Sequence, residues 1–484
     1  MRKRICILGS GTSGLLASIM LKGNFPLYDI HVVSSSKIGI IGVGEGSTEH
    51  WNAHFQKPYG INVDELVHEA KATHKYGIRF ENWTQKTPDY FHSISAGPVG
   101  PEGFASNYSY ALENNWLLTA RLSPNLYQGE VEFNKDSPHS TTNQFHFDTF
   151  ALNNYLKTVA KDRGITLIEG ILQDVKRNTE TGWIESITTD TGKEVFGDFY
   201  IDASGFRRSL ISNLVDDDPF VSYREYLPCD ATAVFPTERD PNGIRPYTRA
   251  RAMPNGWMFE IPTQTRRGNG YIFSSDFCSE DQAVKELSEA HGKEITPARI
   301  LKWKSGYFKK SIVFNCASIG LASSFIEPLE ATSITTSIQQ IRMLMQLIPT
   351  FHMGSSAQIQ KYDEQMEAMM NNILMMISMH YVSDREDTDM WKAQKAAKLP
   401  QQLVDMLALW NERTPRQNDL AIHGYEMFGI AHFWHVAQGQ NLLNPDIAME
   451  ENNAHLNRRD AEDWFVNFSQ SAILRKTVKH ESIF

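Results

Sequence analysis

The chain has 484 residues, of which 41% are hydrophobic and 21% are charged, and its formal net charge is −10. This composition is typical of a globular protein with two or three apolar cores, and the acidic balance without a basic stripe disfavours nucleic acid as a partner. Because no uninterrupted apolar stretch reaches the roughly 18 residues of a membrane-spanning helix, we expect no membrane partner.

The first predicted element is a buried strand over residues 5–8, which runs directly into the pattern Gly9-x-Gly11-x-x-Gly14 and an apolar helix over residues 15–21. In this order, Gly9 permits the tight turn, Gly11 lets the backbone approach a pyrophosphate, and Gly14 lets the helix pack closely on the strand. The N-terminus of the helix offers unpaired N–H groups to the phosphates. The pattern therefore predicts a dinucleotide site, with a plain glycine turn as the alternative.

The second predicted strand covers residues 29–33 and ends in serines rather than in the acidic residue that usually binds a ribose. We expect the hydroxyl of Ser34 or a backbone group to substitute for that residue. A second glycine-rich loop follows, and its alternating glycines, Gly42, Gly44 and Gly46, indicate a backbone against which a ligand lies. Within this loop, Glu45 could hold a ribose or orient the loop; a solvated turn is the alternative.

Lys75 precedes an alternating, half-exposed strand over residues 78–83, and His92 follows in an aromatic stretch. Taken alone, such a lysine is usually a surface residue and such a histidine is usually a packed core residue. Residues 84–140 are rich in Pro, Gly, Ser, Asn and Tyr, and this composition predicts long loops with short strands.

The middle of the chain contains a predicted amphipathic helix over residues 149–163 and a buried strand that ends at Asp202, where the chain returns to the first sheet. Alternating strands over residues 219–310 predict an antiparallel sheet on the substrate side. After another buried strand over residues 318–322, a long helix begins near residue 334.

The chain after residue 350 is predicted to be helical to its end. Methionines at helical spacing between residues 366 and 379 favour an adaptable core over the wall of a pocket. The four cysteines lie far apart and form no C-x-x-C pair, which disfavours a zinc site and indicates a reducing, cytoplasmic setting. They are Cys6, Cys229, Cys278 and Cys316.

Taken together, the motifs resemble those of the flavin-dependent tryptophan halogenase family over residues 1–391. The motifs that carry the resemblance are Gly9-x-Gly11-Thr12-x-Gly14, Gly42-Val43-Gly44-Glu45, Lys75 before Ile78-x-Phe80, His146-Phe147-Asp148, Ile201-Asp202-x-Ser204-Gly205, Trp257-x-x-x-Ile261-Pro262, Phe325-x-x-Pro328-Leu329-Glu330-x-Thr332-Ser333 and His380-Tyr381. One family signature, W-x-W-x-I-P, has Phe259 in place of its second tryptophan. It is thought to keep the reduced flavin from oxygenating the substrate, and we expect the remaining aromatic ring to preserve that barrier.

The resemblance implies an α/β fold of the glutathione-reductase type, as in flavin monooxygenases, with a Rossmann-like FAD-binding unit. Its expected boundaries are residues 1–350, including the inserted antiparallel sheet at about 219–310, and a helical substrate-binding module over 351–484. Reduced FAD would react with O2 to give a peroxyflavin, which a halide (chloride, bromide or iodide) would attack to give hypohalous acid. The residues expected at the cofactor are Gly9, Gly11, Thr12, Ser13, Gly14, Ser34, Gly44, Glu45, Asp202 and Phe325.

The resemblance also implies that the backbone N–H groups of Thr332 and Ser333 hold the halide. Hypohalous acid would then travel through a tunnel to Lys75, which would either hydrogen-bond it as an ammonium or be halogenated as an amine. Glu330 would orient the oxidant or accept the ring proton. Ala331 replaces a serine that is common in the family.

The expected substrate pocket includes His92, Phe91 and Trp434. The Tyr-Tyr pair with which family members clamp free tryptophan has no counterpart anywhere in this sequence. An electron-rich ring of the indole or phenol type is therefore the expected substrate, and a pocket without buried polar contacts should reject few analogues.

The single dinucleotide fingerprint favours reduced flavin delivered by a separate flavin reductase. We expect no metal site, and the sequence leaves monomer and homo-oligomer open. Two alternatives to the halogenase remain at this stage: an FAD-dependent monooxygenase that hydroxylates an aromatic ring, and a flavin-binding protein without turnover.

Overall fold

The computed structural model describes residues 3–93 and 144–450, together with two short strands at 122–123 and 478–479. Within the two long ranges it does not describe residues 41, 43, 87, 88, 218, 422, 445, 448 and 449.

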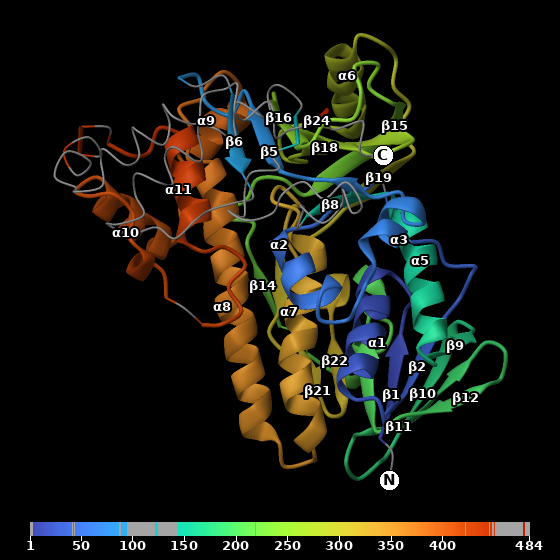
Figure 1. The fold of residues 1–484 in the computed structure, drawn as a ribbon. Coiled ribbons are helices and arrows are strands. Elements are labelled where there is room, and N and C mark those ends of the chain that lie inside the picture. Colours follow the sequence, from blue (N-terminus) through green and yellow to red (C-terminus); the bar gives the residue numbers. More distant parts are fainter. Residues whose placement is uncertain are drawn as a thin grey trace.

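A six-stranded sheet forms the base of the molecule, and its strands are parallel except for one antiparallel strand at an edge. Its β1 strand leads through the glycine turn into helix α1, which packs against helices α5 and α7 (Figure 1). In sheet order, the strands are β21 (Ile312–Val313), β22 (Cys316–Ser318), β13 (Phe199–Asp202), β1 (Arg4–Leu8), β2 (Asp29–Ser34) and β9 (Thr166–Glu169). The helices are α1 (Thr12–Asn24), α5 (Thr149–Asp162) and α7 (Thr332–Leu347).

Both faces of this sheet are covered, as the continuous apolar run of β1 predicts. Ile5 and Ile7 belong to the large core under the helices, whereas Cys6 and Leu8 point to the other face. On that other face they pack against a three-stranded antiparallel sheet of β10 (Leu172–Arg177), β11 (Ile184–Thr189) and β12 (Glu194–Phe196).

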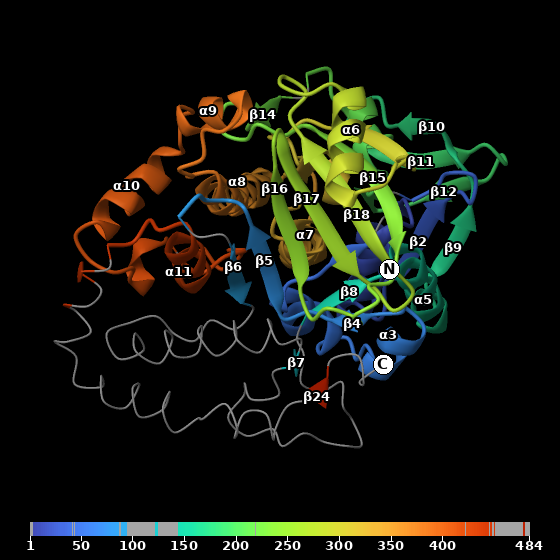
Figure 2. The ribbon, with the colours of Figure 1, turned by 90° about the horizontal axis from the view of Figure 1, so that it is seen from above.

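A seven-stranded sheet lies above the first (Figures 1 and 2). The expected antiparallel sheet from residues 219–310 is present, but two strands from residues 77–93 extend it, and β5 pairs with β16 in parallel. Sequence alternation missed this pairing because it joins segments far apart in the chain. In sheet order, the strands are β19 (Arg299–Lys302), β15 (Ala231–Glu238), β18 (Arg266–Phe273), β17 (Gly256–Pro262), β16 (Thr248–Met253), β5 (Gly77–Glu81) and β6 (Asp89–Ser93).

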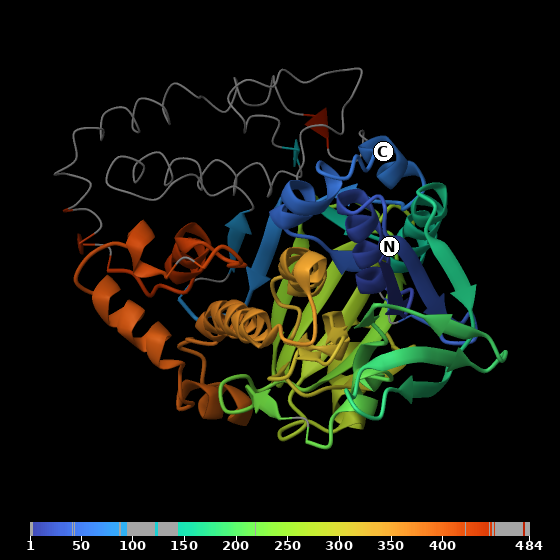
Figure 3. The same ribbon diagram turned by 90° about the horizontal axis from the view of Figure 1, so that it is seen from below.

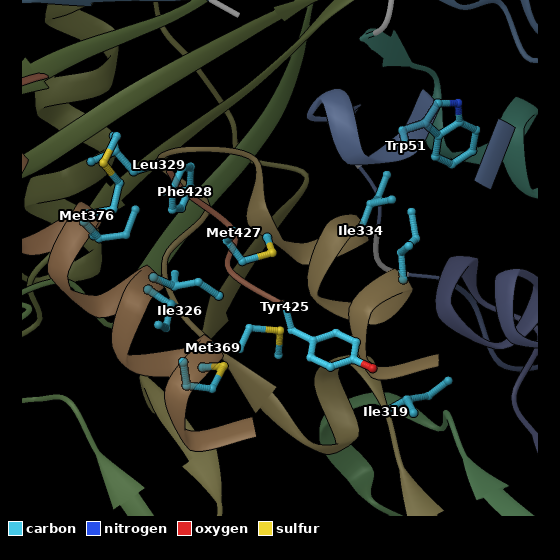
Figure 4. Close-up of a cluster of buried hydrophobic side chains, with 14 of the residues drawn as sticks. Trp51, Ile319, Ile326, Leu329, Ile334, Met369, Met376, Tyr425, Met427 and Phe428 are labelled. Atoms are coloured by element: carbon cyan, nitrogen blue, oxygen red, sulfur yellow. The ribbon is translucent and has the colours of Figure 1, made fainter. Parts of the chain in front are cut away.

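Helix α7 and the long helix α8 lie side by side, and α10 and α11 lie beyond α8 (Figures 1 and 3). The methionines of α8 are buried, which confirms that they are core residues, and Met369 and Met376 gather with Ile326, Leu329 and Phe428 in one cluster (Figure 4). The prediction of helix up to the chain end is wrong in one place, because β24 (Val478–Lys479) pairs with β7 (Leu122–Ser123). These helices are α8 (Ser356–His380), α9 (Asp389–Lys395), α10 (Gln401–Trp410) and α11 (Ile430–Gly439).

Within residues 3–93 and 144–450, no helix has both the length and the apolar character that a membrane-spanning segment needs. Shorter elements join the layers of the fold. The short strands are β3 (Glu45–Gly46), β4 (Thr73–His74), β8 (Phe145–Phe147), β14 (Phe220–Ser222), β20 (Gly306–Phe308) and β23 (Ser324–Phe325). The short helices are α2 (Glu49–Trp51) and α3 (Val63–His68), and α6 (Glu280–His291) lies on the seven-stranded sheet.

Two glycines of the first turn should differ in how well they tolerate a methyl group. A Cβ on Gly14 would lie 2.0 Å from the carbonyl oxygen of Gly9, whereas a Cβ on Gly11 would meet nothing within 4 Å. We expect Gly14→Ala to lower the free energy of unfolding by about 1–3 kcal/mol, as other overpacked positions do, despite the better helix propensity of alanine. Gly11→Ala should change it by less than about 0.5 kcal/mol. Urea denaturation followed by circular dichroism measures both, and equal losses would contradict the assignment of separate roles.

Candidate functional site

The turn between β1 and α1 presents a cradle for a phosphate group. Gly11 is the N-cap of α1, no side chain caps this helix, and its first turn contains no acidic residue. The space over Gly11 is open, so that a ligand can approach the first N–H groups directly. Thr12 donates a hydrogen bond of 3.5 Å to Glu45, and Ser13 lies 2.8 Å from Ser337 of α7. These residues therefore fit the diphosphate of a flavin dinucleotide through their backbone.

An acidic side chain does stand beside the end of β2, but it comes from the neighbouring strand. Ser34 pairs with Glu169 at the end of β9. The Oε1 atom of Glu169 accepts hydrogen bonds from the N–H of Ser36 at 2.8 Å and from the hydroxyls of Ser36 and Ser35 at 2.9 and 3.1 Å. These bonds lower the pKa of this exposed carboxyl. Sequence reasoning missed Glu169 because the register of two distant strands is not visible in the sequence.

Asp202 does not have a free carboxylate for the cofactor. Its Oδ1 accepts the N–H and the hydroxyl of Ser204 at 2.9 and 2.6 Å, and its Oδ2 accepts the N–H groups of Leu210 and Ile211 at 2.8 and 2.9 Å. The side chain is fully buried. The carboxylate closes the turn after β13, because four donors of that turn already use both oxygens. A role of Asp202 at the cofactor stays a prediction, and it cannot rest on this carboxylate.

The second glycine loop, which includes Gly44 and Gly46, lies next to Lys75. The strands β3 and β4 both pair with β8, so Gly46 and the residues before Lys75 lie on either side of it. A Cβ on Gly46 would lie 3.5 Å from the amine nitrogen of Lys75 and 3.3 Å from Cβ of Ala331. Gly44, with φ of +118°, and Glu45 precede this contact, and burial raises the pKa of Glu45 to about 7.

Lys75 is a buried lysine, with 2% of its surface exposed. Its amine donates a hydrogen bond of 2.9 Å to the carbonyl oxygen of Ser47. Burial lowers its pKa to about 8, although the charges of Glu330 and Glu49 act in the opposite direction. At neutral pH this amine is therefore much closer to losing its proton than a surface lysine is.

Glu330 lies in the turn before α7 and is held between two histidines. Nδ1 of His92 lies 2.9 and 2.8 Å from its two oxygens, and Nε2 of His380 lies 2.6 Å from Oε1. Burial alone would raise the pKa of Glu330, but the charges and hydrogen bonds of His92 and His380 outweigh it and hold the pKa well below its usual range. Glu330 and Lys75 thus share one buried cluster, in which Glu330 is ionised.

Further groups that sequence reasoning missed extend this cluster. On one side, the hydroxyl of Tyr90 lies 2.9 Å from Nδ1 of His380. On the other side, Nε2 of His92 lies 2.9 Å from Nδ1 of His432, and Nε2 of His432 lies 3.3 Å from Glu49. The sequence shows His432 close to His435 in a segment predicted to be helical. Nothing in the sequence indicates that the side chain of His432 points toward His92.

The N-terminus of α7 begins next to Glu330 and is free of any side-chain cap. Ala331 takes up a left-handed conformation with φ of 57°, and Thr332 and Ser333 form the first turn. The proximity of Ala331 to Gly46 places this turn beside the second glycine loop. Uncapped N–H groups at a helix N-terminus suit a small anion.

The aromatic signature surrounds another buried carboxylate. Glu327 accepts hydrogen bonds from Nε1 of Trp257 at 2.7 Å and from the hydroxyl of Tyr381 at 2.8 Å. Burial raises the pKa of Glu327 to about 7. The rings of Trp257 and Phe259 lie 6.1 Å apart, so an aromatic ring does occupy the position of the missing tryptophan. Phe325, expected at the cofactor, packs 5.4 Å from the ring of Phe206.

The structure does not bring Phe91 to the cluster of His92. Consecutive residues of β6 point to opposite faces, and Phe91 packs with Tyr76 and Tyr247. Both ring nitrogens of His92 are already hydrogen-bonded, which leaves its ring face and carbon edge for an aromatic molecule. Trp434 is buried in α11, the helix that also carries His432.

Known proteins match this chain over most of its length. The family model described as tryptophan halogenase matches residues 4–453. Tryptophan 6-halogenase SttH of Streptomyces toxytricini is 29% identical over 447 residues, with 85% of this chain and 84% of that protein covered. Tryptophan 7-halogenase RebH of Lentzea aerocolonigenes is 30% identical over 441 residues, covering 83% and 81%.

Among solved structures, Xcc4156, a flavin-dependent halogenase from Xanthomonas campestris, has a TM-score of 0.86 at 25% identity, with 100% of this chain and 97% of that chain covered. The mixed α/β fold expected from the sequence is therefore confirmed, including its relation to flavin-dependent enzymes. With the family model spanning nearly the whole chain, this protein belongs to the tryptophan halogenase family and is a flavin-dependent halogenase of an aromatic substrate, which uses reduced FAD, O2 and a halide.

Proposed function

We propose that Lys75 and Glu330 carry out the transfer of the halogen to the aromatic ring. The observation that carries this proposal is the position of the Lys75 amine, which is buried, has a pKa of about 8 and lies against Gly46 in the cluster that contains Glu330. A lysine with a lowered pKa, in a cluster with an ionised carboxylate and next to a loop suited to a cofactor, supports a catalytic role over a structural one.

The flavin site in this proposal consists of the turn at Gly11, the loop at Gly44 and Glu45, and the carboxylate of Glu169 in place of the acid missing at Ser34. The halide is bound by the first turn of α7, at Thr332 and Ser333. When bound, the reduced flavin supplies hypohalous acid from O2 and the halide. The chain itself then has to keep this oxidant from water and lead it to Lys75.

Lys75 can activate hypohalous acid in either of its protonation states. As an ammonium, it donates a hydrogen bond to the oxygen and makes the halogen more electrophilic. As an amine, it displaces water, so that an N–halogen bond forms, the O–halogen bond breaks and one N–H proton leaves with the hydroxide. Glu330, which is ionised, then accepts the proton that the ring loses as it regains aromaticity.

The substrate in this proposal is an electron-rich ring of the indole or phenol type. SttH and RebH are named for tryptophan, but the sequence of this chain has no Tyr-Tyr pair to clamp an amino acid. His92 offers only its ring face and carbon edge to such a substrate. Trp434 lies on α11, the helix whose His432 contacts His92. A separate flavin reductase would supply the reduced flavin, and the four buried free cysteines support a cytoplasmic location.

Lys75→Met keeps most of the apolar stem and removes the amine. We expect halogenation to fall by at least about 10³-fold, in the range typical of catalytic proton-transfer and activating groups, while binding of FAD stays unchanged. The assay supplies FAD, NADH, a flavin reductase, bromide or chloride, and a panel of indoles, phenols and tryptophan, with products identified by mass spectrometry. Full halogenation by Lys75→Met would remove this residue from the mechanism. A wild-type product heavier by one oxygen would instead support the hydroxylase.

Glu330→Gln keeps the shape of the side chain and removes its charge. We expect turnover to fall by about 10²–10⁴-fold, because the ring proton then has no carboxylate to accept it. Glu327→Gln is the matched control, since Glu327 is also buried but hydrogen-bonds Trp257 and Tyr381 rather than the two histidines. Turnover is measured under saturating reductase, and an undiminished rate of Glu330→Gln would exclude its role as the base.

A further inference from the structure

A contact between two histidines links Glu330 and Glu49, the two carboxylates whose charges act on Lys75. The four groups follow one another as Glu330, His92, His432 and Glu49, at distances of 2.8, 2.9 and 3.3 Å. His92 and Glu330 are buried, and the side chains of His432 and Glu49 are 14% and 28% exposed. The segments that carry them, β6, the turn before α7, α11 and α2, are far apart in the sequence.

The geometry of this chain fixes the number of protons on the two rings. The outer nitrogens, Nδ1 of His92 and Nε2 of His432, face carboxylates, and an ionised carboxylate only accepts hydrogen bonds. Each outer nitrogen must therefore carry a proton. The two inner nitrogens lie 2.9 Å apart, and a hydrogen bond between them requires one proton. Three protons on four nitrogens give the pair one positive charge, because two neutral imidazoles carry only two.

We propose that His92 and His432 form a dyad that holds one positive charge between Glu330 and Glu49, and that His432 is a positioning residue which thereby sets the protonation of Lys75. The charge of the dyad is independent of turnover, and only its effect on catalysis rests on the proposed function of Lys75. The two carboxylates that the dyad neutralises in part are the same two that favour the ammonium form of Lys75. A cationic dyad therefore shifts Lys75 toward the amine.

The pKa directions agree with this charge. Burial lowers the pKa of His432, but Glu49 and Glu330 raise it above its usual value overall. His435, one turn further along α11, has its pKa lowered to about 3 by burial and by its two histidine neighbours, so it is uncharged. Among the described residues, further titratable groups at this site are His380 and Tyr90 beside Glu330, and His50 and His54 near Glu49. Gln144, which is not titratable, donates to Glu49 at 3.1 Å.

The test measures the titration midpoint of Lys75 directly, by NMR of protein labelled with 13C at the lysine Cε, with the resonance assigned by its absence in Lys75→Met. His432→Gln removes the charge of the dyad and leaves Glu49 ionised, so we expect the midpoint to rise by roughly one pH unit. In the double variant His432→Gln/Glu49→Gln, one positive and one negative charge are lost, and the midpoint should return to within about 0.3 units of wild type. His435→Gln is the control and should leave the midpoint in place.

An unmoved midpoint in His432→Gln would overturn the dyad, since a purely structural role lowers activity without shifting the titration. Should His432→Gln fail to fold, 15N-histidine spectra of the wild type at pH 7.5 count the protonated ring nitrogens of the pair, and two rather than three would overturn it. The proposed function fails by a different outcome, namely full halogenation by Lys75→Met, whatever the midpoints are.

Discussion

The buried charges around Lys75 are the constraint on which the rest of the site depends. An isolated carboxylate or ammonium is costly to remove from water, so a buried cluster must satisfy each charge with donors and opposite charges. Glu330 meets this requirement through His92 and His380 and stays ionised. Lys75 has no comparable partner in the described cluster beyond one carbonyl oxygen, and its pKa falls to about 8. In the same buried cluster, Glu330 therefore keeps its negative charge, whereas Lys75 loses its proton more easily.

The fold holds these groups because its layers converge on them. Lys75 follows β4, one edge of a small sheet in which β8 is the middle strand, and β3 at the opposite edge belongs to the second glycine loop. Glu330 is fixed between β23 and α7, while α8 contributes His380 from its last turn. The apolar cluster between α7 and α8, with Leu329 next to Glu330, anchors that turn (Figure 4). Precise placement of the charges therefore depends on a close-packed core beneath them.

Sequence patterns predicted the elements well wherever a local rule decides the structure. The glycine turn, the buried run of β1 and the apolar methionines of α8 each carry their own signal. The motifs also singled out Lys75 and Glu330 through a family resemblance, and the structure brings both into one buried cluster, while their catalytic roles stay a prediction. The sequence could not predict contacts between distant segments, whether strand register or helix packing sets them. Glu169 beside Ser34, and His432 beside His92, are both of this kind.

The saturated carboxylate of Asp202 and the charge of the dyad between Glu330 and Glu49 both follow from the number of hydrogen-bond donors and acceptors at each site. A buried carboxylate that already accepts four hydrogen bonds within its own turn, as Asp202 does, has no capacity left for a ligand. In contrast, the hydrogen bonds that join two carboxylates through two imidazoles require three protons on the ring nitrogens, whereas two neutral imidazoles carry two. The excess proton gives the dyad of His92 and His432 one positive charge, which offsets part of the charge of the two carboxylates that act on Lys75. Such charges act on a buried amine more strongly than they would in water. The electrostatics around Lys75 therefore extend to a histidine, His432, that has no direct contact with either Lys75 or Glu330 among the described interactions.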